Sequence, residues 1–239
     1  MSKKKRKPVT AKELLDELRA NPEWVAGQKA QERRRRAWSA ALLANEAPVV
    51  ADLRTAGFDV NTVSDLFNRK EPWRKDVPIP PWPEAVPILI EHLDRPYSFE
   101  VREGIVRALT APWGRLAFDR LVEEFRRTAD PAVAAEEQRK AVELVMAEAG
   151  DLYTRDEVEQ IMRHRWDSYR FALANAIVYH FEQEHIPLIV GLIRHSTDER
   201  EEHWQALADE IRKKRRRWRR KDPDVGSELL ALVESLRSP

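Results

Sequence analysis

Apolar residues recur at intervals of three and four along most of the chain, which is the spacing of an amphipathic helix. Thr10 followed by Glu13 forms a capping-box pattern, which predicts a short helix directly after it. Asn21 and Pro22 then supply a cap and a first-turn proline, and a long helix is predicted over residues 22–43. Only seven glycines are present, too few for a sheet with many tight turns. The sequence therefore predicts an all-α protein.

Turn-forming residues divide the next stretch into shorter helices. Pro48 predicts a break before a helix over residues 49–55, because an internal proline removes a helical hydrogen bond. Gly57 is placed to end that helix, since glycine adopts the left-handed conformation common there. Asn61 or Thr62 can cap a further short helix.

A segment rich in proline and tryptophan follows. Residues 71–84 contain five prolines together with Trp73 and Trp82. Proline at this density disfavours regular helix and strand, so we expect a semi-rigid linker, and the large rings indicate that it packs against something. The predicted organisation is a basic tail and helical N-terminal arm over residues 1–70, this linker, and a repeat domain over residues 85–239.

Beyond the linker the helical pattern recurs in pairs. The segment at residues 102–109 aligns with residues 139–146 and 170–177, and more faintly near residue 206, at offsets of 37, 31 and 34. Each copy has a small residue where neighbouring helices must approach, followed by an apolar one that fills the core between layers. These small residues are Gly104, Ala141, Ala172 and Ala206.

Residues 101–109, VREGIVRAL, resemble the second helix of bacterial HEAT repeats, and residues 85–95 are similar to their first helix. The resemblance covers residues 83–211 and implies a HEAT-like α-solenoid of about four helix pairs. Residues 225–236 would then cap the solenoid. Proteins of this kind typically bind macromolecules, which is what the resemblance implies here. An unrelated helical bundle is the alternative fold.

The formal net charge of +1 conceals a strong segregation of charge. Residues 1–36 carry 12 Lys/Arg against 5 Asp/Glu, and residues 212–221 carry nine basic residues and no acid. The rest of the chain has 21 basic and 36 acidic side chains, so an acidic body lies between two basic ends. Patches of this kind attract partners of opposite charge.

Two basic clusters are the candidate binding surfaces. Lys and Arg neutralise phosphates, and a tryptophan within such a run can stack on a base. The same side chains can instead dock on an acidic protein surface, in this chain or another. The candidate residues are Arg33, Arg34, Arg35, Arg36, Arg212, Lys213, Lys214, Arg215, Arg216, Arg217, Trp218, Arg219, Arg220 and Lys221. Four consecutive arginines cover every side of a helix, so at least one of the first four should point toward whatever that helix packs on.

No catalytic residue, metal ligand or cofactor site is predicted. The chain has no cysteine, no nucleophile-elbow motif and no phosphate-binding loop. His180 and His185 are five residues apart, whereas zinc-binding helices place two histidines four apart. HEAT-like alkylated-DNA glycosylases combine aromatic residues with an acid, which Trp166, Asp167 and Tyr169 could imitate. Asp167 fits equally well as the cap of a new helix.

The predicted function is therefore non-catalytic binding of a macromolecule, with another protein as the first choice of partner. This protein would act as a scaffold or as a regulatory or neutralising partner. The alternative is nucleic-acid binding through residues 212–221, and the remote alternative is a DNA glycosylase. No apolar run is long enough to span a membrane, and the absence of cysteine favours the cytoplasm.

Overall fold

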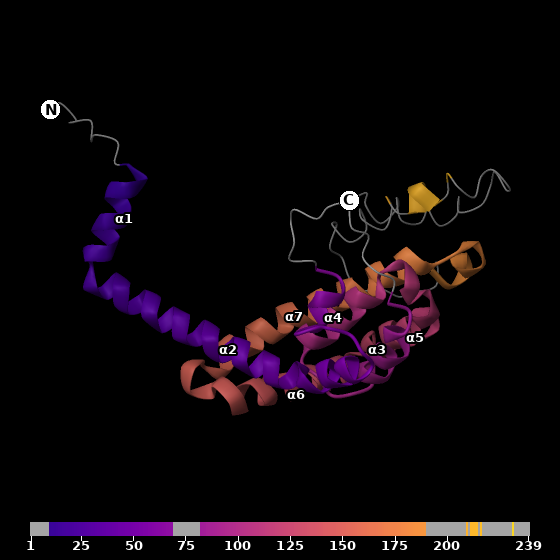
Figure 1. Cartoon of the computed structure of the whole chain (residues 1–239), viewed down its shortest axis with the longest axis horizontal. Coiled ribbons are helices and arrows are strands. Elements are labelled where there is room, and N and C mark those ends of the chain that lie inside the picture. The colour runs from indigo at the N-terminus through magenta and orange to yellow at the C-terminus, as the bar shows by residue number, and fades with distance from the viewer. Residues whose placement is uncertain are drawn as a thin grey trace.

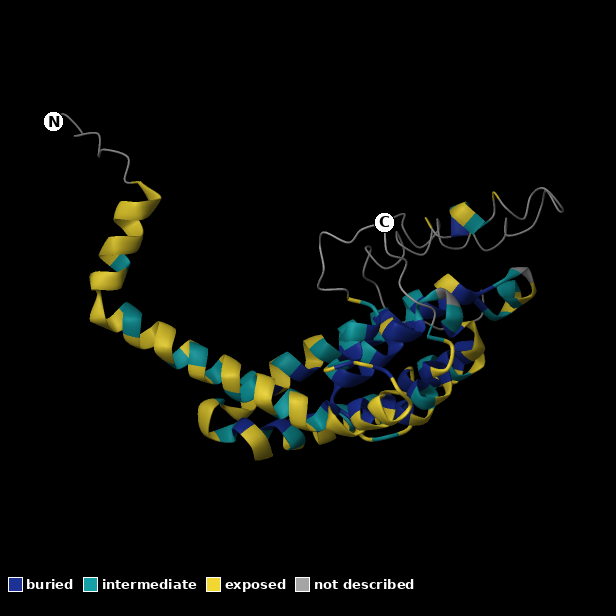
Figure 2. Ribbon diagram, in the orientation of Figure 1, coloured by how far each residue is buried: buried dark blue, intermediate teal, exposed yellow. Residues whose placement is uncertain are grey.

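The computed structural model describes residues 10–68, 82–189, 209, 211–214, 216 and 231. These residues form helices and turns and no strand, which confirms the all-α prediction for the described part of the chain. A helical arm projects from a body of packed helices (Figure 1). Figure 2 shows that the arm is largely exposed, whereas buried residues concentrate in the body. None of the helices in the described ranges has both the length and the apolar character that a membrane crossing requires.

The arm consists of α1 (Ala11–Ala20) and the first half of α2 (Pro22–Thr55). The predicted capping box is present, because the Thr10 hydroxyl accepts from the Glu13 N–H and the Glu13 carboxylate accepts from the Thr10 N–H. Asn21 ends α1 and caps α2, with its side-chain oxygen accepting from two backbone N–H groups. Both predicted helix starts are confirmed.

The predicted break at Pro48 is wrong, because α2 continues through this residue. An internal proline costs a helix about 3 kcal/mol. Tertiary packing offsets that cost, since Val49 and Leu53 are completely buried against the body. The helix ends instead before Gly57, whose φ of 92° is the left-handed conformation expected after a helix.

A short connection after α2 packs against α4. The 3₁₀-helix η1 (Val63–Leu66) begins after Thr62, as predicted, and the Asp65 carboxylate accepts from the Thr62 N–H. Trp82 packs on Phe58 at a ring distance of 5.1 Å, so this linker tryptophan does have a packing partner. Trp73 and the rest of the linker up to residue 81 lie outside the described residues.

Five α-helices and three 3₁₀-helices build the remaining described body. Two helix pairs come first and a long single helix follows them. In chain order the elements are α3 (Ala85–Leu93), α4 (Phe99–Leu109), η2 (Pro112–Ala117), α5 (Phe118–Thr128), α6 (Pro131–Ala149), η3 (Gly150–Leu152), α7 (Arg155–His180) and η4 (Gln183–His185).

The predicted repeat register fails at its third copy. Asp167 does not cap a helix, because it lies in the middle of α7, which is continuous from Arg155 to His180. Residues 170–177 are thus the second half of one long helix rather than the second member of a pair. That helix packs against α4, α5 and α6 together. The fourth copy near residue 206 and the predicted capping helix over 225–236 lie outside the described residues.

A buried network of charges lies where these four helices meet. Arg102 of α4 donates to Glu124 of α5 over 2.5 Å and to Glu137 of α6 over 2.6 Å. Arg127 donates to both oxygens of Glu124, and the Tyr169 hydroxyl of α7 donates to the same carboxylate over 2.6 Å. Glu124 and Tyr169 are completely buried. Burial of charge is costly unless it is paired in this way.

The small residues of the register differ in their surroundings, which leads to a first prediction. Ala172 is buried in α7, so Ala172→Leu should overpack the core and cost about 1–3 kcal/mol. Gly104 is only half-buried and faces Val63 of η1 rather than a helix of another pair, and an added Cβ would lie 3.9 Å from that side chain. Gly104→Ala should therefore stabilise α4 by up to about 1 kcal/mol. Urea denaturation measures both changes. A destabilised Gly104→Ala variant would contradict this packing.

The charge network generates a second prediction. Burial alone would raise the pKa of Glu124, but hydrogen bonds from Arg127 and Tyr169 and the charge of Arg102 outweigh it, and the pKa is lowered. A carboxylate with a lowered folded-state pKa stabilises the fold above its unfolded value of about 4.3, and this contribution is lost as the pH falls. Glu124→Gln should cost about 3–5 kcal/mol at neutral pH.

The same substitution should also flatten the fall in stability between pH 5 and pH 3, as chemical denaturation at several pH values would show. Glu123→Gln is the matched control, because this neighbour on α5 is exposed. It should change stability by less than about 0.5 kcal/mol. Equal losses for the two variants would show that the network does not stabilise the fold.

Candidate functional site

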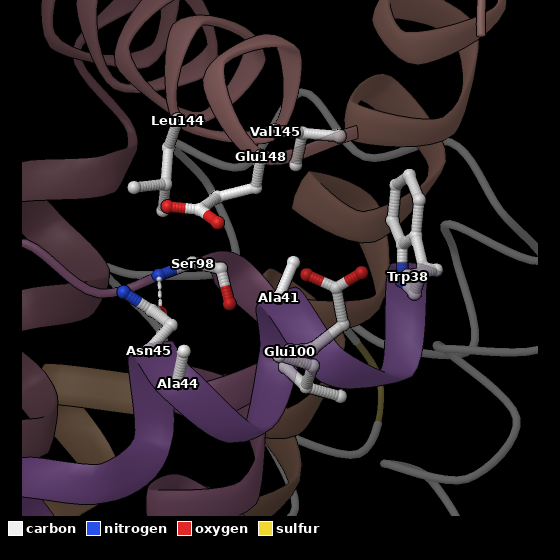
Figure 3. Close-up of a pocket in the computed structure, with 10 residues that line it drawn as sticks. Trp38, Ala41, Ala44, Asn45, Ser98, Glu100, Leu144, Val145 and Glu148 are labelled. Carbon is white, nitrogen blue, oxygen red and sulfur yellow. Dashed lines mark hydrogen bonds between the residues drawn. The ribbon is translucent and has the colours of Figure 1, made fainter. Parts of the chain in front are cut away.

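A pocket of about 210 Å³ lies where the arm joins the body (Figure 3). Its walls come from α2, from the start of α4 and from the last turns of α6. Most of the lining is apolar, and four polar side chains interrupt it. Prominent lining residues are Trp38, Leu42, Leu144 and Val145 on the apolar part and Asn45, Ser98, Glu100 and Glu148 on the polar part.

Ser98 holds an unusual position in the pocket wall. It precedes α4 as the N-cap residue, where a serine hydroxyl normally accepts a hydrogen bond from the first turn. Its hydroxyl makes no such bond and is buried without a hydrogen-bond partner. The Ser98 N–H instead donates to the side-chain oxygen of Asn45 over 2.8 Å, which ties α4 to α2. The hydroxyl is thus a buried polar group in the pocket wall that the described residues leave without a hydrogen bond.

Glu100 lies two residues further on and is the most deeply buried acid of the pocket. Its side chain is 10% exposed, and its Oε1 has no hydrogen-bond partner. Arg165 of α7 approaches this oxygen to 3.3 Å without forming a hydrogen bond, so the contact is one of charge alone. Burial raises the pKa of Glu100 in spite of this arginine and of the Trp38 indole.

Trp38 forms the outer end of the pocket and is held in place by the body. Its ring lies edge-on to Tyr153 at a centroid distance of 5.5 Å. One turn earlier on α2, Arg34 stacks over the same tyrosine at 4.3 Å and donates to Glu157 over 2.7 Å. These contacts fix the direction in which the arm leaves the body.

The arginine cluster at residues 33–36 is thus partly structural. Arg34 faces the body, which confirms that at least one of the four would do so. Arg35 and Arg36 both donate to Glu32 on the same helix, so part of their charge is neutralised. Arg33 is exposed on the arm.

The described part of the second basic cluster also contacts the body. Lys214 donates to the backbone carbonyls of Tyr179 and Phe181 over 2.7 Å each, at the carboxyl end of α7. A cation stabilises the carbonyls at this end of a helix. Arg212 pairs with Asp209, and Lys213 and Arg216 are exposed. The other members of this cluster, Arg215, Arg217, Trp218, Arg219, Arg220 and Lys221, lie outside the described residues.

The two clusters contact opposite ends of α7. Arg34 pairs with Glu157 in its first turn, whereas Lys214 binds the carbonyls at its last turn. At 1.5 Å per residue, these ends are roughly 35 Å apart. The described residues of the two clusters therefore do not form one continuous basic surface.

The residues considered for chemistry have roles in the fold. Trp166 and Tyr169 are buried against Phe99 in the core. The His180 ring donates from Nε2 to the Leu109 carbonyl over 2.6 Å. His185 lies beyond the end of α7, and its ring packs on Phe118. Within the described ranges, no group of three or more acidic or histidine side chains is placed to hold a metal.

The pocket was not found by sequence reasoning. Ser98 and Glu100 match the ordinary pattern of a helix start, where a cap and an acid in the first turn are common. Their burial depends on α2 and α6, which are distant in the sequence. Comparison with models of known protein families, with curated proteins and with solved structures gives no match.

The position of Glu100 yields a third prediction. Because its folded-state pKa is raised, the associated stability is present below the unfolded value and is lost as the pH rises through the folded value. Glu100→Gln keeps the shape and removes the ionisation, so it should raise the free energy of unfolding at pH 8 by about 0.5–2 kcal/mol. Urea denaturation at pH 5 and pH 8 measures this. Glu148→Gln, at an exposed position, should leave the free energy of unfolding almost unchanged. A Glu100→Gln variant that is less stable than the wild type at pH 8 would contradict a raised pKa at Glu100.

Proposed function

We propose that this protein binds another protein and that α1 is its main binding element. The observation that carries the proposal is that α1 buries none of its residues, although it carries an apolar stripe. Leu14 is 51% exposed and Leu15 is 46% exposed. A helix with this stripe gains stability only when a further surface covers it.

The stripe has the spacing of a docking helix. Ala11, Leu14, Leu15 and Leu18 occupy positions i, i+3, i+4 and i+7, which places them on one face. Helices that bind in a groove use these four positions as anchors. The partner is therefore expected to offer an apolar groove about three turns long.

The other side of α1 indicates the charge of the groove rim. Three acidic residues of α1 lie away from the stripe, namely Glu13, Asp16 and Glu17. The helix has two basic residues, Lys12 and Arg19, so its net charge is negative. A rim with basic side chains would complement them and speed association. The partner is thus a protein with an apolar groove and a basic rim.

The arm is prepared for this role before binding. A ten-residue helix is marginal alone, but α1 is capped at its start by Thr10 and followed directly by the cap of α2 at Asn21. A preformed helix avoids part of the ordering cost of binding. Full burial of Leu14 and Leu15 would contribute about 1.5–3 kcal/mol each.

The body is proposed to serve as a HEAT-like scaffold for this arm, without catalysis and in the cytoplasm. The pairs α3–α4 and α5–α6 support the repeat hypothesis, because each joins two successive helices and α4 carries the HEAT-like residues 101–109. α7 covers both pairs. The cytoplasmic location rests on the absence of cysteine.

The fourth prediction tests the role of the stripe. Leu14→Glu combined with Leu15→Glu removes the anchors but keeps good helix formers, so folding should be unaffected. Affinity purification from the native host, with nuclease treatment and quantitative mass spectrometry, should recover a protein with the wild type that this variant loses. Rebinding with purified components should show a loss of roughly 100-fold or more.

A charge-matched control lies on the same arm. Gln28→Glu with Gln31→Glu adds the same two charges at exposed positions of α2 and should retain the partner. Equal retention by both variants would overturn the proposal, as would partner loss in both. Sedimentation of the purified protein would show whether the partner is a second copy of this chain. Self-association through α1 would also contradict the proposal that the partner is another protein.

The same preparations decide the nucleic-acid alternative. Fluorescence anisotropy with single- and double-stranded oligonucleotides should show only weak binding that vanishes near physiological salt. Tight binding at physiological salt that falls when Arg215, Arg216 and Arg217 are replaced by Gln would favour the alternative.

A further inference from the structure

We propose that the pocket between α2, α4 and α6 binds a small organic cation, a primary ammonium group on a short apolar tail. This site is separate from the proposed docking helix and does not depend on it. The inference rests on the charge of the lining, on two buried polar atoms without hydrogen-bond partners, and on the size and apolar character of the walls.

Among the described residues of the lining, the charged side chains are carboxylates, and none is a lysine or arginine. Glu100 and Glu148 face the same space in Figure 3. Arg165 reaches Glu100 from α7 by a charge contact at 3.3 Å, while Glu148 has no ion pair within the described part of the chain. The pocket therefore has an excess of negative charge, which repels anions and attracts a cation.

The buried polar atoms require a hydrogen-bond donor. Oε1 of Glu100 is an acceptor, and it is buried without a hydrogen bond from the described residues, since the Arg165 contact is one of charge alone. The Ser98 hydroxyl, on a residue that is 5% exposed, has no hydrogen-bond partner in the described part of the chain either. Leaving such groups unsatisfied costs stability, so native proteins usually satisfy them with protein, water or ligand. An ammonium group brings three N–H donors, enough for both acceptors.

The size and apolar character of the pocket walls indicate the part of the ligand that carries the ammonium group. A cavity of 150 Å³ holds benzene, so about 210 Å³ has room for roughly eight non-hydrogen atoms. Leu42, Leu144 and Val145 provide an apolar surface for a short alkyl chain. The ring of Trp38 adds a face to which a cation is attracted.

The test compares n-hexylammonium with 1-hexanol, which has the same chain and a neutral head. Isothermal titration calorimetry of the whole 239-residue chain should give saturable one-to-one binding of the amine. The alcohol should bind at least roughly tenfold more weakly, because hydrogen bonds to a charged group are the stronger ones. Equal binding of the two compounds, or no saturable binding of the amine up to about 10 mM, would overturn the proposal.

Variants then locate the binding. Glu100→Gln and Ser98→Ala should each weaken amine binding, by roughly tenfold or more for the first, and Ala41→Leu should block the pocket without changing its charge. Glu136→Gln is the matched control, because this carboxylate is on α6 outside the pocket. Thermal unfolding checks that each variant is folded. Unchanged binding in Glu100→Gln and Ala41→Leu, or an equal loss in Glu136→Gln, would place the amine elsewhere and refute the site.

Discussion

The carboxylate of Glu124 is completely buried, and three helices besides its own reach it or its partners. Arg102 approaches from α4, Arg127 from α5 and Tyr169 from α7, and Arg102 extends the network to Glu137 of α6. A buried ion pair adds little net stability compared with an apolar core, because desolvation offsets the attraction. The network nevertheless favours one arrangement of the helices, because a displacement of one helix would leave a buried charge without its partner. The packing of α4 to α7 depends on this constraint.

The network also explains why the body differs from a simple stack. In a solenoid each pair contacts only its neighbours. Here α7 must place Tyr169 beside Glu124 while its first turn receives Arg34 from the arm. One helix spanning both points satisfies both requirements, and a break at Asp167 would separate them. The continuous α7 thus joins a contact in its first turn to one near its middle.

Features that depend on neighbouring residues could be predicted from the sequence, whereas features that depend on packing between distant helices could not. The caps at Thr10 and Asn21 could be predicted because their hydrogen bonds involve residues two or three positions away. The break at Pro48 could not be excluded, because the burial of Leu53 that offsets it depends on distant helices. The inward arginine at Arg34 was expected from helical geometry alone, but its identity and its partner were not.

The pocket could not be predicted from the sequence for a related reason, because its walls come from helices that are distant in the chain. A comparison of Glu100 with Arg102 shows why the pocket is a candidate site. Glu100 and Arg102 are two residues apart on α4, and both are largely buried. Arg102 has carboxylate partners on two other helices, whereas Glu100 has an unsatisfied oxygen and a raised pKa. A helix that pairs one charge so fully could have carried an apolar residue at the other position.

A buried acid with an unsatisfied oxygen beside a cavity is typical of a binding site, where the sequence departs from what stability alone would favour. The location adds a mechanical consequence. α2 is one continuous helix of 34 residues. The pocket wall from Trp38 to Asn45 and the second part of the projecting arm therefore belong to the same helix. A molecule bound in the pocket would contact both α2 and the body. It would do so close to the point where Arg34 and Trp38 pack on Tyr153 and set the direction of the arm.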